Sequence, residues 1–258
     1  MKKTFLTFAL LCFALVFVGC KETQYTYYDK ANSKPKEVFE VDKETGKKDG
    51  KYKWFAEDGT VLLECSYKEG NLDAHKSTMT DSRDGKNYKT VKTCSKTWMA
   101  ENLNYKTEDS YCYNDKESNC QKYGRLYKWE ATKNACPTGW HLPSKEELET
   151  LIAAVGGKEV AGKKLKSTSG WEEYKGKSGN GDDVFGFSAL PAGCRGCVVA
   201  LEDVGNEYEY YSHEGNGAYF WSSTEDGSRF AYTMNLNDDA DLDSSYKLMG
   251  FSVRCVKD

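Results

Sequence analysis

Ten cysteines in a chain of 258 residues constrain the fold more than any other feature of this sequence. Two of them, Cys12 and Cys20, lie near the amino terminus, and the other eight are spread from Cys65 to Cys255. An even number of cysteines is typical of exported proteins, whose thiols pair into disulfides. Zinc is the rival interpretation, but the three histidines are scattered and the chain holds a single CxxC pair, so no second ligand pair completes a tetrahedral site. We therefore predict four structural disulfides.

Residues 1–19 have the pattern of a secretory signal peptide. Lys2 and Lys3 precede an apolar run that is shorter than the roughly 20 residues a spanning helix needs. The run ends in Phe17-Val18-Gly19-Cys20, which resembles the lipobox of bacterial lipoproteins. The resemblance implies cleavage before Cys20 and a diacylglycerol on its thiol, whereas an ordinary signal peptide with an incidental cysteine is the alternative.

A lipidated Cys20 predicts an exported protein held on the cell envelope by its acyl chains while its body stays in water. Lys21 follows the anchor where an aspartate would signal retention, which favours the outer membrane. The formal net charge is −4. Because phosphate neutralisation needs a basic face, we expect no nucleic-acid partner.

The next two segments differ in character. Residues 20–49 are polar and rich in Lys, Glu and Thr, which predicts a lipidated tether. In residues 50–79, Glu57-Asp58-Gly59 joins two short apolar runs, a strong signal for a β-hairpin. The spacing of Gly50, Trp54, Gly59, Tyr67 and Gly70 resembles one MORN-type repeat, and a plain hairpin is the alternative.

Residues 80–258 predict two helices among many short strands. Tyr123–Ala135 places Leu126, Trp129 and Ala131 near one helical face and is expected to form the first helix. The second begins at Ser144, which with Glu147 forms a capping box, and ends at Gly156-Gly157. Strands are expected at Ala218–Trp221 and Phe251–Val256. This order predicts an α+β domain.

Seven motifs of this region, in order along the chain, resemble the Fibrobacter succinogenes major paralogous domain family. They are DSRDGKNYKTV (81–91), TWMAENLNY (97–105), GRLY (124–127), CPTGWHLPS (136–144), GFSALPAG (186–193), FWSST (220–224) and GFSVRC (250–255).

That family is similar to a branch of the C-type-lectin-like superfamily, which also contains the formylglycine-generating enzymes. The resemblance implies a C-type-lectin-like domain of two helices and small antiparallel sheets, preceded here by the β-hairpin module. It also implies disulfides between Cys112 and Cys120 and between Cys136 and Cys255. As a further hypothesis we pair the remaining cysteines as Cys65 with Cys94 and Cys194 with Cys197.

Catalytic motifs are weak in this sequence. No serine lies in a G-x-S-x-G elbow, which argues against a Ser-His-Asp hydrolase. His141 lies just before a capped helix, where a histidine bonded to the backbone is the commoner outcome. Cys194 and Cys197 are candidates for the paired cysteines of the oxidase relatives, but their glycine-rich setting differs from the pattern of those enzymes. The apolar residues after Cys197 carry no helix cap that favours a reactive thiolate.

Two groups of residues are candidates for binding. Asp238, Asp239, Asp241 and Asp243 offer hard oxygen ligands suited to Ca²⁺, with a solvated loop as the alternative. They do not form an EF-hand, because the twelfth position from Asp239 is Gly250 rather than glutamate. The other group is aromatic, and its rings suit sugar faces or a protein partner. It consists of Tyr208, Tyr210, Tyr211 and Trp221.

The sequence therefore predicts a lipid-anchored envelope protein whose domain binds rather than catalyses. The expected partner is polysaccharide or a cell-surface protein, as in adhesion, and no cofactor is expected apart from the candidate Ca²⁺. Two alternatives stay open: an oxidase similar to the formylglycine-generating enzymes, and a purely structural envelope protein.

Overall fold

The computed structural model describes residues 20–184, 186–197, 210–237 and 239–257. The predicted signal peptide lies outside these residues. Strands account for 43% of the structure and helices for 14%, in several separate sheets. The expectation of an α+β, C-type-lectin-like domain is therefore wrong, because the long segments before the first helix and after the last one pair into sheets of four and five strands. Within the described ranges, no helix is long and apolar enough to cross a membrane.

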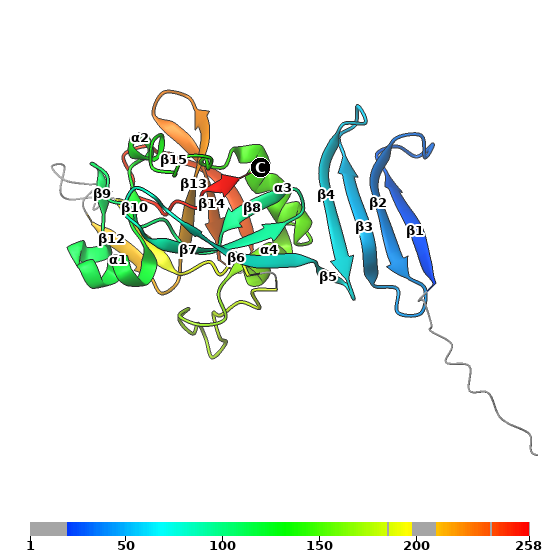
Figure 1. Cartoon of the computed structure of the whole chain (residues 1–258), viewed down its shortest axis with the longest axis horizontal. Helices are drawn as coiled ribbons and strands as arrows, with labels where there is room; N and C mark the ends of the chain where they lie inside the picture. Colours follow the sequence, from blue (N-terminus) through cyan, green and yellow to red (C-terminus); the bar gives the residue numbers. More distant parts are fainter. Residues whose placement is uncertain (1–19, 185, 198–209, 238, 258) are drawn as a thin grey trace, which may run out of the picture.

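The amino-terminal part of the chain is a five-stranded antiparallel meander, which lies at one end of the molecule (Figure 1). Each strand pairs with the next one along the chain. The strands are β1 (Lys21–Tyr27), β2 (Pro35–Asp42), β3 (Lys48–Phe55), β4 (Val61–Lys68) and β5 (Asn71–Leu72).

Two of these strands, β1 and β2, occupy the segment expected as a tether. Alternate residues of β2 face the sheet's apolar side, where Phe39 packs against Tyr52 and Val41 is buried. Glu37, on the same face, accepts a hydrogen bond of 2.7 Å from the Tyr52 hydroxyl. These contacts cross between strands, so the polar composition of residues 20–49 did not reveal them.

Strands β3 and β4 form the predicted hairpin. The Ala56 N–H donates to Thr60 O and the Gly59 N–H to Ala56 O, and Gly59 has φ +89°, a conformation that favours glycine. The hairpin packs against the rest of the chain: the Tyr67 hydroxyl donates to Ala154 O at 2.5 Å. The amino-terminal sheet therefore shares one apolar core with the residues that follow it.

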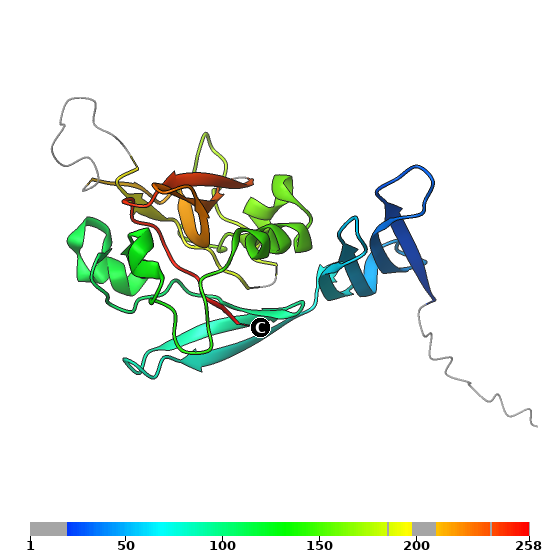
Figure 2. The same ribbon diagram turned by 90° about the horizontal axis from the view of Figure 1, so that it is seen from above.

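A four-stranded antiparallel sheet follows, in the order β16-β8-β7-β6. A turn at residues 81–85 joins β6 to β7, and in it the Gly85 N–H donates to Asp81 O. The sheet lies below the helices in the view of Figure 2. Its strands are β6 (Ala74–Thr80), β7 (Asn87–Thr93), β8 (Lys96–Met99) and β16 (Val256–Lys257).

The single helix expected at Tyr123–Ala135 does not form. Helix α1 (Glu117–Tyr123) ends there instead, because Gly124 has φ +76° and an added Cβ would lie 2.8 Å from Asn102 O. After it come β10 (Leu126–Tyr127), which pairs with β9 (Ser110–Tyr111), and the single-turn helix α2 (Trp129–Thr132). A 3-10 helix, η1 (Tyr113–Asp115), precedes α1.

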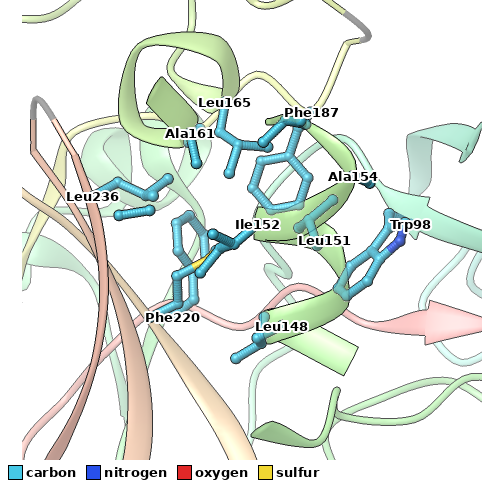
Figure 3. Packing of buried hydrophobic residues seen from close by; sticks show 14 of the residues in the cluster. Trp98, Leu148, Leu151, Ile152, Ala154, Ala161, Leu165, Phe187, Phe220 and Leu236 are labelled. Atoms are coloured by element: carbon cyan, nitrogen blue, oxygen red, sulfur yellow. The ribbon is translucent and has the colours of Figure 1, made fainter. Parts of the chain in front are cut away.

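Helix α3 (Lys145–Ala154) has the predicted capping box: Ser144 Oγ accepts from the Glu147 N–H, and the Glu147 carboxylate accepts from the Ser144 N–H. The glycine pair 156–157 ends it as expected, and a second helix that we did not predict, α4 (Lys158–Leu165), begins at once. Both helices turn their apolar faces to one core, where Leu148 and Leu165 lie near Phe220 (Figure 3).

The carboxy-terminal sheet has five strands in the order β12-β11-β13-β14-β15. They are β11 (Ala192–Arg195), β12 (Tyr211–Glu214), β13 (Ala218–Asp226), β14 (Phe230–Leu236) and β15 (Ala240–Tyr246). The expected strand at Ala218–Trp221 is the first part of β13. The one expected at Phe251–Val256 is mostly irregular and pairs only through single bridges, such as Phe251 with Tyr127, before β16 begins.

All four predicted disulfides are confirmed. The pairs are Cys65–Cys94, Cys112–Cys120, Cys136–Cys255 and Cys194–Cys197. The first of them fastens the amino-terminal sheet to β7 and β8, and the third joins the end of the α2 region to the last segment of the chain. Cys20 is exposed and unpaired among the described residues.

Candidate functional site

The predicted aromatic site is not assembled as the sequence suggested. Tyr208 lies outside the described residues, and Tyr210 is exposed. Tyr211 is only partly exposed, and its hydroxyl donates to Asp115 at 2.7 Å. Burial, together with this hydrogen bond, raises the pKa of Tyr211 well above its usual range. The Tyr211 ring also packs against Tyr113, so little of its face is free for a ligand.

Trp221 serves the core rather than a binding surface. Its side chain is 0% exposed, and its indole N–H donates to Tyr127 O at 2.7 Å. The ring packs against Phe251, with the two ring centres 4.6 Å apart. Its neighbours on β13, Phe220 and Ser222, are buried as well, so both faces of the strand are covered at this point. The aromatic composition of the segment could not reveal this.

The acidic segment is a strand rather than a loop. Asp238 lies outside the described residues, and Asp239 precedes β15, which contains Asp241 and Asp243. Asp241 pairs with the Lys158 ammonium, and Asp243 accepts from the Asn235 amide at 3.2 Å. Residues two apart on a strand are about 7 Å from each other, too far for one Ca²⁺ to bind both without rearrangement. Among the described carboxylates, these three do not form a cluster of oxygen ligands.

The tyrosines and the aspartates do not share a concavity. Tyr211 is on β12 and Asp241 on β15, the two opposite edges of the five-stranded sheet. Each group must therefore be considered by itself, and the structure directs attention to a different surface.

A polar cleft lies beside α4, between the segment after Trp171 and the turn that joins β14 to β15. Its volume is about 640 Å³. Two aromatic rings and several carboxylate and amide groups face it, which is the combination that orients a sugar ligand in a protein cleft. The lining residues are Glu159, Lys166, Trp171, Glu172, Tyr174, Gly179, Asn216, Asn237 and Asp239.

Tyr174 is the most exposed large apolar side chain among the described residues, at 71%. Its backbone N–H and C=O both pair with Lys177, at 3.0 Å each. Lys175 and Gly176, between them, have φ +51° and +75°, the positive values of a type I′ turn. The tight turn therefore presents the Tyr174 ring on an ordered backbone, with the Lys175 ammonium 5.0 Å from the ring centre.

Trp171 forms the floor of the cleft. Its indole N–H lies 3.1 Å from both Ser167 Oγ and Ala189 O, and its side chain is almost fully buried. The Lys166 ammonium lies 4.6 Å from the ring centre. Trp171 is thus held in place from below, whereas Tyr174 stands free at the rim.

The segment that carries both rings is fastened at several points. The Trp171 N–H donates to Asn180 Oδ1, and the Glu172 N–H donates to Gly215 O. Gly179 permits a close approach, because an added Cβ would lie 2.2 Å from Glu172 O. The bond to Gly215 connects this segment to the turn before β13, and the Asp182 N–H just after it donates to Lys163 O of α4, so the shape of the cleft is fixed.

A second hollow adjoins the main cleft and shares Glu159, Lys166 and Tyr174 with it. The rest of the main cleft adds the carboxylates of Glu172 and Asp239, whereas the second hollow adds three lysines and Asp182. A ligand in the main cleft therefore meets mostly acceptor groups, which suits the hydroxyl donors of a neutral sugar.

Sequence reasoning missed this site. Tyr174-Lys-Gly-Lys177 holds a turn signal beside an aromatic residue, but the candidate binding residues were chosen elsewhere in the sequence. The other side of the cleft comes from Asn216, Asn237 and Asp239. Asp239 was predicted only as a Ca²⁺ ligand, and no local pattern connects these residues with Tyr174.

Cys194 and Cys197 form a disulfide whose surroundings come from a second strand. Cys194 is on β11, opposite Ser212 of β12. The ring nitrogen Nδ1 of His213 lies 3.6 Å from Cys194 Sγ. If the disulfide is reduced, the two thiols and His213 offer three metal-ligating atoms within 4.8 Å of one another. A second such group, Cys112, Glu117 and Cys120, also includes a disulfide.

His141 has a structural place, but its ring contacts a carboxylate rather than the backbone group that we expected. Its backbone pairs with Val256, and its Nε2 lies 3.0 Å from Glu147 Oε1. Burial raises the pKa of the Glu147 carboxyl, but hydrogen bonds from Lys96, the Ser144 backbone and His141 outweigh it and leave the pKa below its usual value. His141 thereby supports the amino-terminal cap of α3.

A comparison with family models finds one that matches residues 73–257, described as the Fibrobacter succinogenes major domain. The match spans more than half of the chain and includes the cleft, the disulfide at Cys194 and all of the helices. No curated protein and no solved structure matches the chain.

Proposed function

Because the chain belongs to the Fibrobacter succinogenes major domain family, whose model covers the cleft, we propose that the family domain binds polysaccharide through this cleft. In this proposal the protein is exported, anchored to the cell envelope by lipid on Cys20, and acts by adhesion. The observation that carries the proposal is the exposed ring of Tyr174 at the rim of a polar cleft.

Stacking on Tyr174 supplies the apolar part of the interaction. One face of a sugar ring is apolar, and an aromatic side chain offers a flat surface of matching size. The type I′ turn holds Tyr174 in place before the ligand arrives, so little conformational entropy is lost on binding. Tyr25 is also exposed, at 53%, but lies on β1 away from the cleft and stacks on Tyr27.

Hydrogen bonds from the cleft supply the orientation. The side chains of Asn216 and Asn237 offer both donors and acceptors, and those of Glu172 and Asp239 offer acceptors. These groups suit hydroxyls whether or not a metal ion is present, and Asp241 is already paired with Lys158. We therefore expect sugar binding to persist when Ca²⁺ is removed by a chelator.

The amino-terminal sheet connects the proposed lipid anchor to the family domain through ordered structure. In the proposed envelope-bound protein, lipid on Cys20 leads directly into β1, and the sheet shares the core of the family domain. The cleft is lined by α4 and its neighbours, whereas β1 is the outermost strand of the sheet beyond β4 (Figure 1). The binding surface is thereby separated from the membrane by the width of the sheet.

The test is retention of the mature protein on an array of plant-wall and cell-envelope glycans. We expect measurable binding to at least one neutral polysaccharide. The Tyr174→Ala variant should bind it at least about tenfold more weakly, or about 1.4 kcal/mol, because the stacking surface is lost. Tyr25→Ala is the matched control, and its affinity should equal that of the unaltered protein.

Two results would refute the proposal. Absence of retention on every glycan of the array would leave a protein partner or a structural role in the envelope. Binding that Tyr174→Ala and Tyr25→Ala reduce equally, or not at all, would place the sugar site elsewhere on the molecule.

A further inference from the structure

We propose that the Cys194–Cys197 disulfide is a thiol-exchange site, that His213 assists cleavage of its sulfur–sulfur bond, and that a protein dithiol is its reductant. This proposal is independent of sugar binding. It rests on the surroundings of the two sulfur atoms, which differ from those of the other three disulfides.

The first observation is the position of His213. Its Nδ1 lies 3.6 Å from Cys194 Sγ, and Ser212 Oγ lies 3.4 Å from the same sulfur and 3.0 Å from His213 Nδ1. A disulfide opens faster when the departing thiolate is stabilised, and a protonated imidazole next to the sulfur can donate its proton there. The His213 side chain is exposed, so it can regain a proton from water.

The second observation is that the two sulfurs differ in access. Cys194 is 0% exposed, whereas Cys197 is partly exposed. An attacking thiolate must approach along the sulfur–sulfur axis and can reach Cys197 more readily. Cys194 is then the leaving group, and it is the sulfur that His213 contacts.

The third observation is that the fold holds this arrangement firmly. The Arg195 N–H donates to Gly250 O, and the Gly250 N–H donates to Arg195 O, so the backbone next to Cys194 is paired on both sides. An added Cβ on Gly193 would lie 2.3 Å from Ser212 O, so only glycine lets β12 come this close. His213 itself has φ +65°, an unfavourable conformation for a residue with a side chain, and such residues cluster at functional sites.

The exchange proceeds in two displacements. A thiolate of the reductant attacks Cys197 Sγ and forms a mixed disulfide, while the electron pair of the breaking bond passes to Cys194 Sγ, which takes the proton of His213 Nδ1. The second thiolate of the reductant then attacks its own sulfur in the mixed disulfide and releases the Cys197 thiolate, which takes a proton from water. Two electrons pass to the cysteine pair, and the reductant becomes a disulfide.

The other disulfides lack this combination. Cys112 and Cys120 have the Arg125 guanidinium nearby, but both are buried. Cys94 is partly exposed, but its sulfur contacts the Thr93 hydroxyl, which is a poor proton donor. Among the described residues, His213 is the histidine whose ring nitrogen contacts a disulfide sulfur, since His75 and His141 face carboxylates.

The test uses the mature full chain and dithiothreitol as a model dithiol. Aliquots are alkylated at intervals, and the four disulfides are followed separately by peptide mass spectrometry. We expect Cys194–Cys197 to open at least about tenfold faster than any of the others. We also expect His213→Asn to slow its opening about tenfold or more.

The control for this variant is His75→Asn, which alters an exposed histidine that faces Asp73 and should leave the opening rate of Cys194–Cys197 unchanged. Asparagine is chosen because it tolerates positive φ better than other side chains, so the backbone at residue 213 can be kept. The unfolding temperature of the His213→Asn variant is measured together with its rate of disulfide opening.

The rate comparison among the four disulfides of the unaltered chain needs no variant. Opening of Cys194–Cys197 no faster than Cys65–Cys94 overturns the proposal, and so does an unchanged rate in a folded His213→Asn variant. Tight retention of zinc or copper by the reduced pair, with loss of reoxidation, would also overturn it in favour of a metal site.

Discussion

Replacing Arg254 by methionine is expected to destabilise the family domain severely. The Arg254 side chain is 1% exposed, and burial lowers its pKa to about 9, so it still carries its charge at neutral pH. Its guanidinium donates to Asn102 Oδ1 at 2.7 Å and Ser188 O at 2.9 Å, and also to Met99 O and Phe187 O. It therefore ties the closing segment to two distant parts of the chain.

The magnitude follows from the acceptors that are left behind. Methionine keeps much of the volume that packs on Phe187 and Phe220, but four oxygens lose their donor. At about 1 kcal/mol for each buried acceptor, the loss is about 4 kcal/mol. For a protein of this size, about 2 to 4 °C per kcal/mol gives a fall of about 8 to 16 °C in unfolding temperature. The unfolding temperature of the Arg254→Lys variant should lie between those of the unaltered protein and Arg254→Met, because one ammonium cannot reach four oxygens.

The assay is thermal unfolding followed by circular dichroism, with the disulfides intact. Arg229→Met is the matched control, because Arg229 is exposed in the turn between β13 and β14 and its loss should change stability by less than about 0.5 kcal/mol. Equal unfolding temperatures for the Arg254 and Arg229 variants would refute the reasoning that the buried guanidinium organises this core.

Two further predictions concern the frame. Replacing Cys136 and Cys255 together by serine should lower the free energy of unfolding by about 2 to 5 kcal/mol, because this disulfide closes a loop of 119 residues. Denaturant titration measures the loss. A loss smaller than that caused by removing the Cys194–Cys197 disulfide would contradict the prediction. The Glu147 carboxyl has a lowered pKa in the folded protein, so its contribution to stability is present above its unfolded pKa and is lost as the pH falls through the folded value. In the Glu147→Gln variant this part of the pH dependence should vanish. Unfolding in urea from about pH 6 to pH 3 measures it, and identical stability profiles for the two proteins would contradict the prediction.

The parts of the fold that sequence predicted are those in which the signal and the structure are close in the chain. Ser144 and Glu147 are three residues apart and cap α3, and Asp58-Gly59 sits in the turn that it was expected to form. The cysteine pairs could be assigned because a resemblance supplied two of them and left four cysteines to pair. The capping box and the Asp-Gly pair therefore predicted local elements, and the cysteines predicted the cross-links.

The fold class was mistaken because sheet formation depends on partners far along the chain. Phe39 lies in the segment that we predicted as a tether, and its place in the sheet depends on its contact with Tyr52 of another strand. Likewise, Gly124 ends α1 because Asn102 leaves no room for a side chain, and nothing within residues 123–135 reveals this contact.

The candidate sites were missed for the same reason. Tyr174 and Asp239 line one cleft although they are far apart in sequence, and His213 meets Cys194 only because β12 pairs with β11. Trp221 is an aromatic residue of a kind that often binds ligands, but it is fully buried, as are its neighbours Phe220 and Ser222 on β13. Residue type was informative, whereas the side to which each residue points was decided by long-range pairing.

Hydrogen–deuterium exchange with and without a bound oligosaccharide tests the central claim most directly, because it maps the sugar site on the unaltered protein. We predict slower exchange in residues 171–181 and at residues 216 and 237, which surround the cleft, and no change at Tyr210 and Tyr211 on the opposite edge of the sheet. Protection at Tyr210 and Tyr211 without protection of 171–181 would contradict the account.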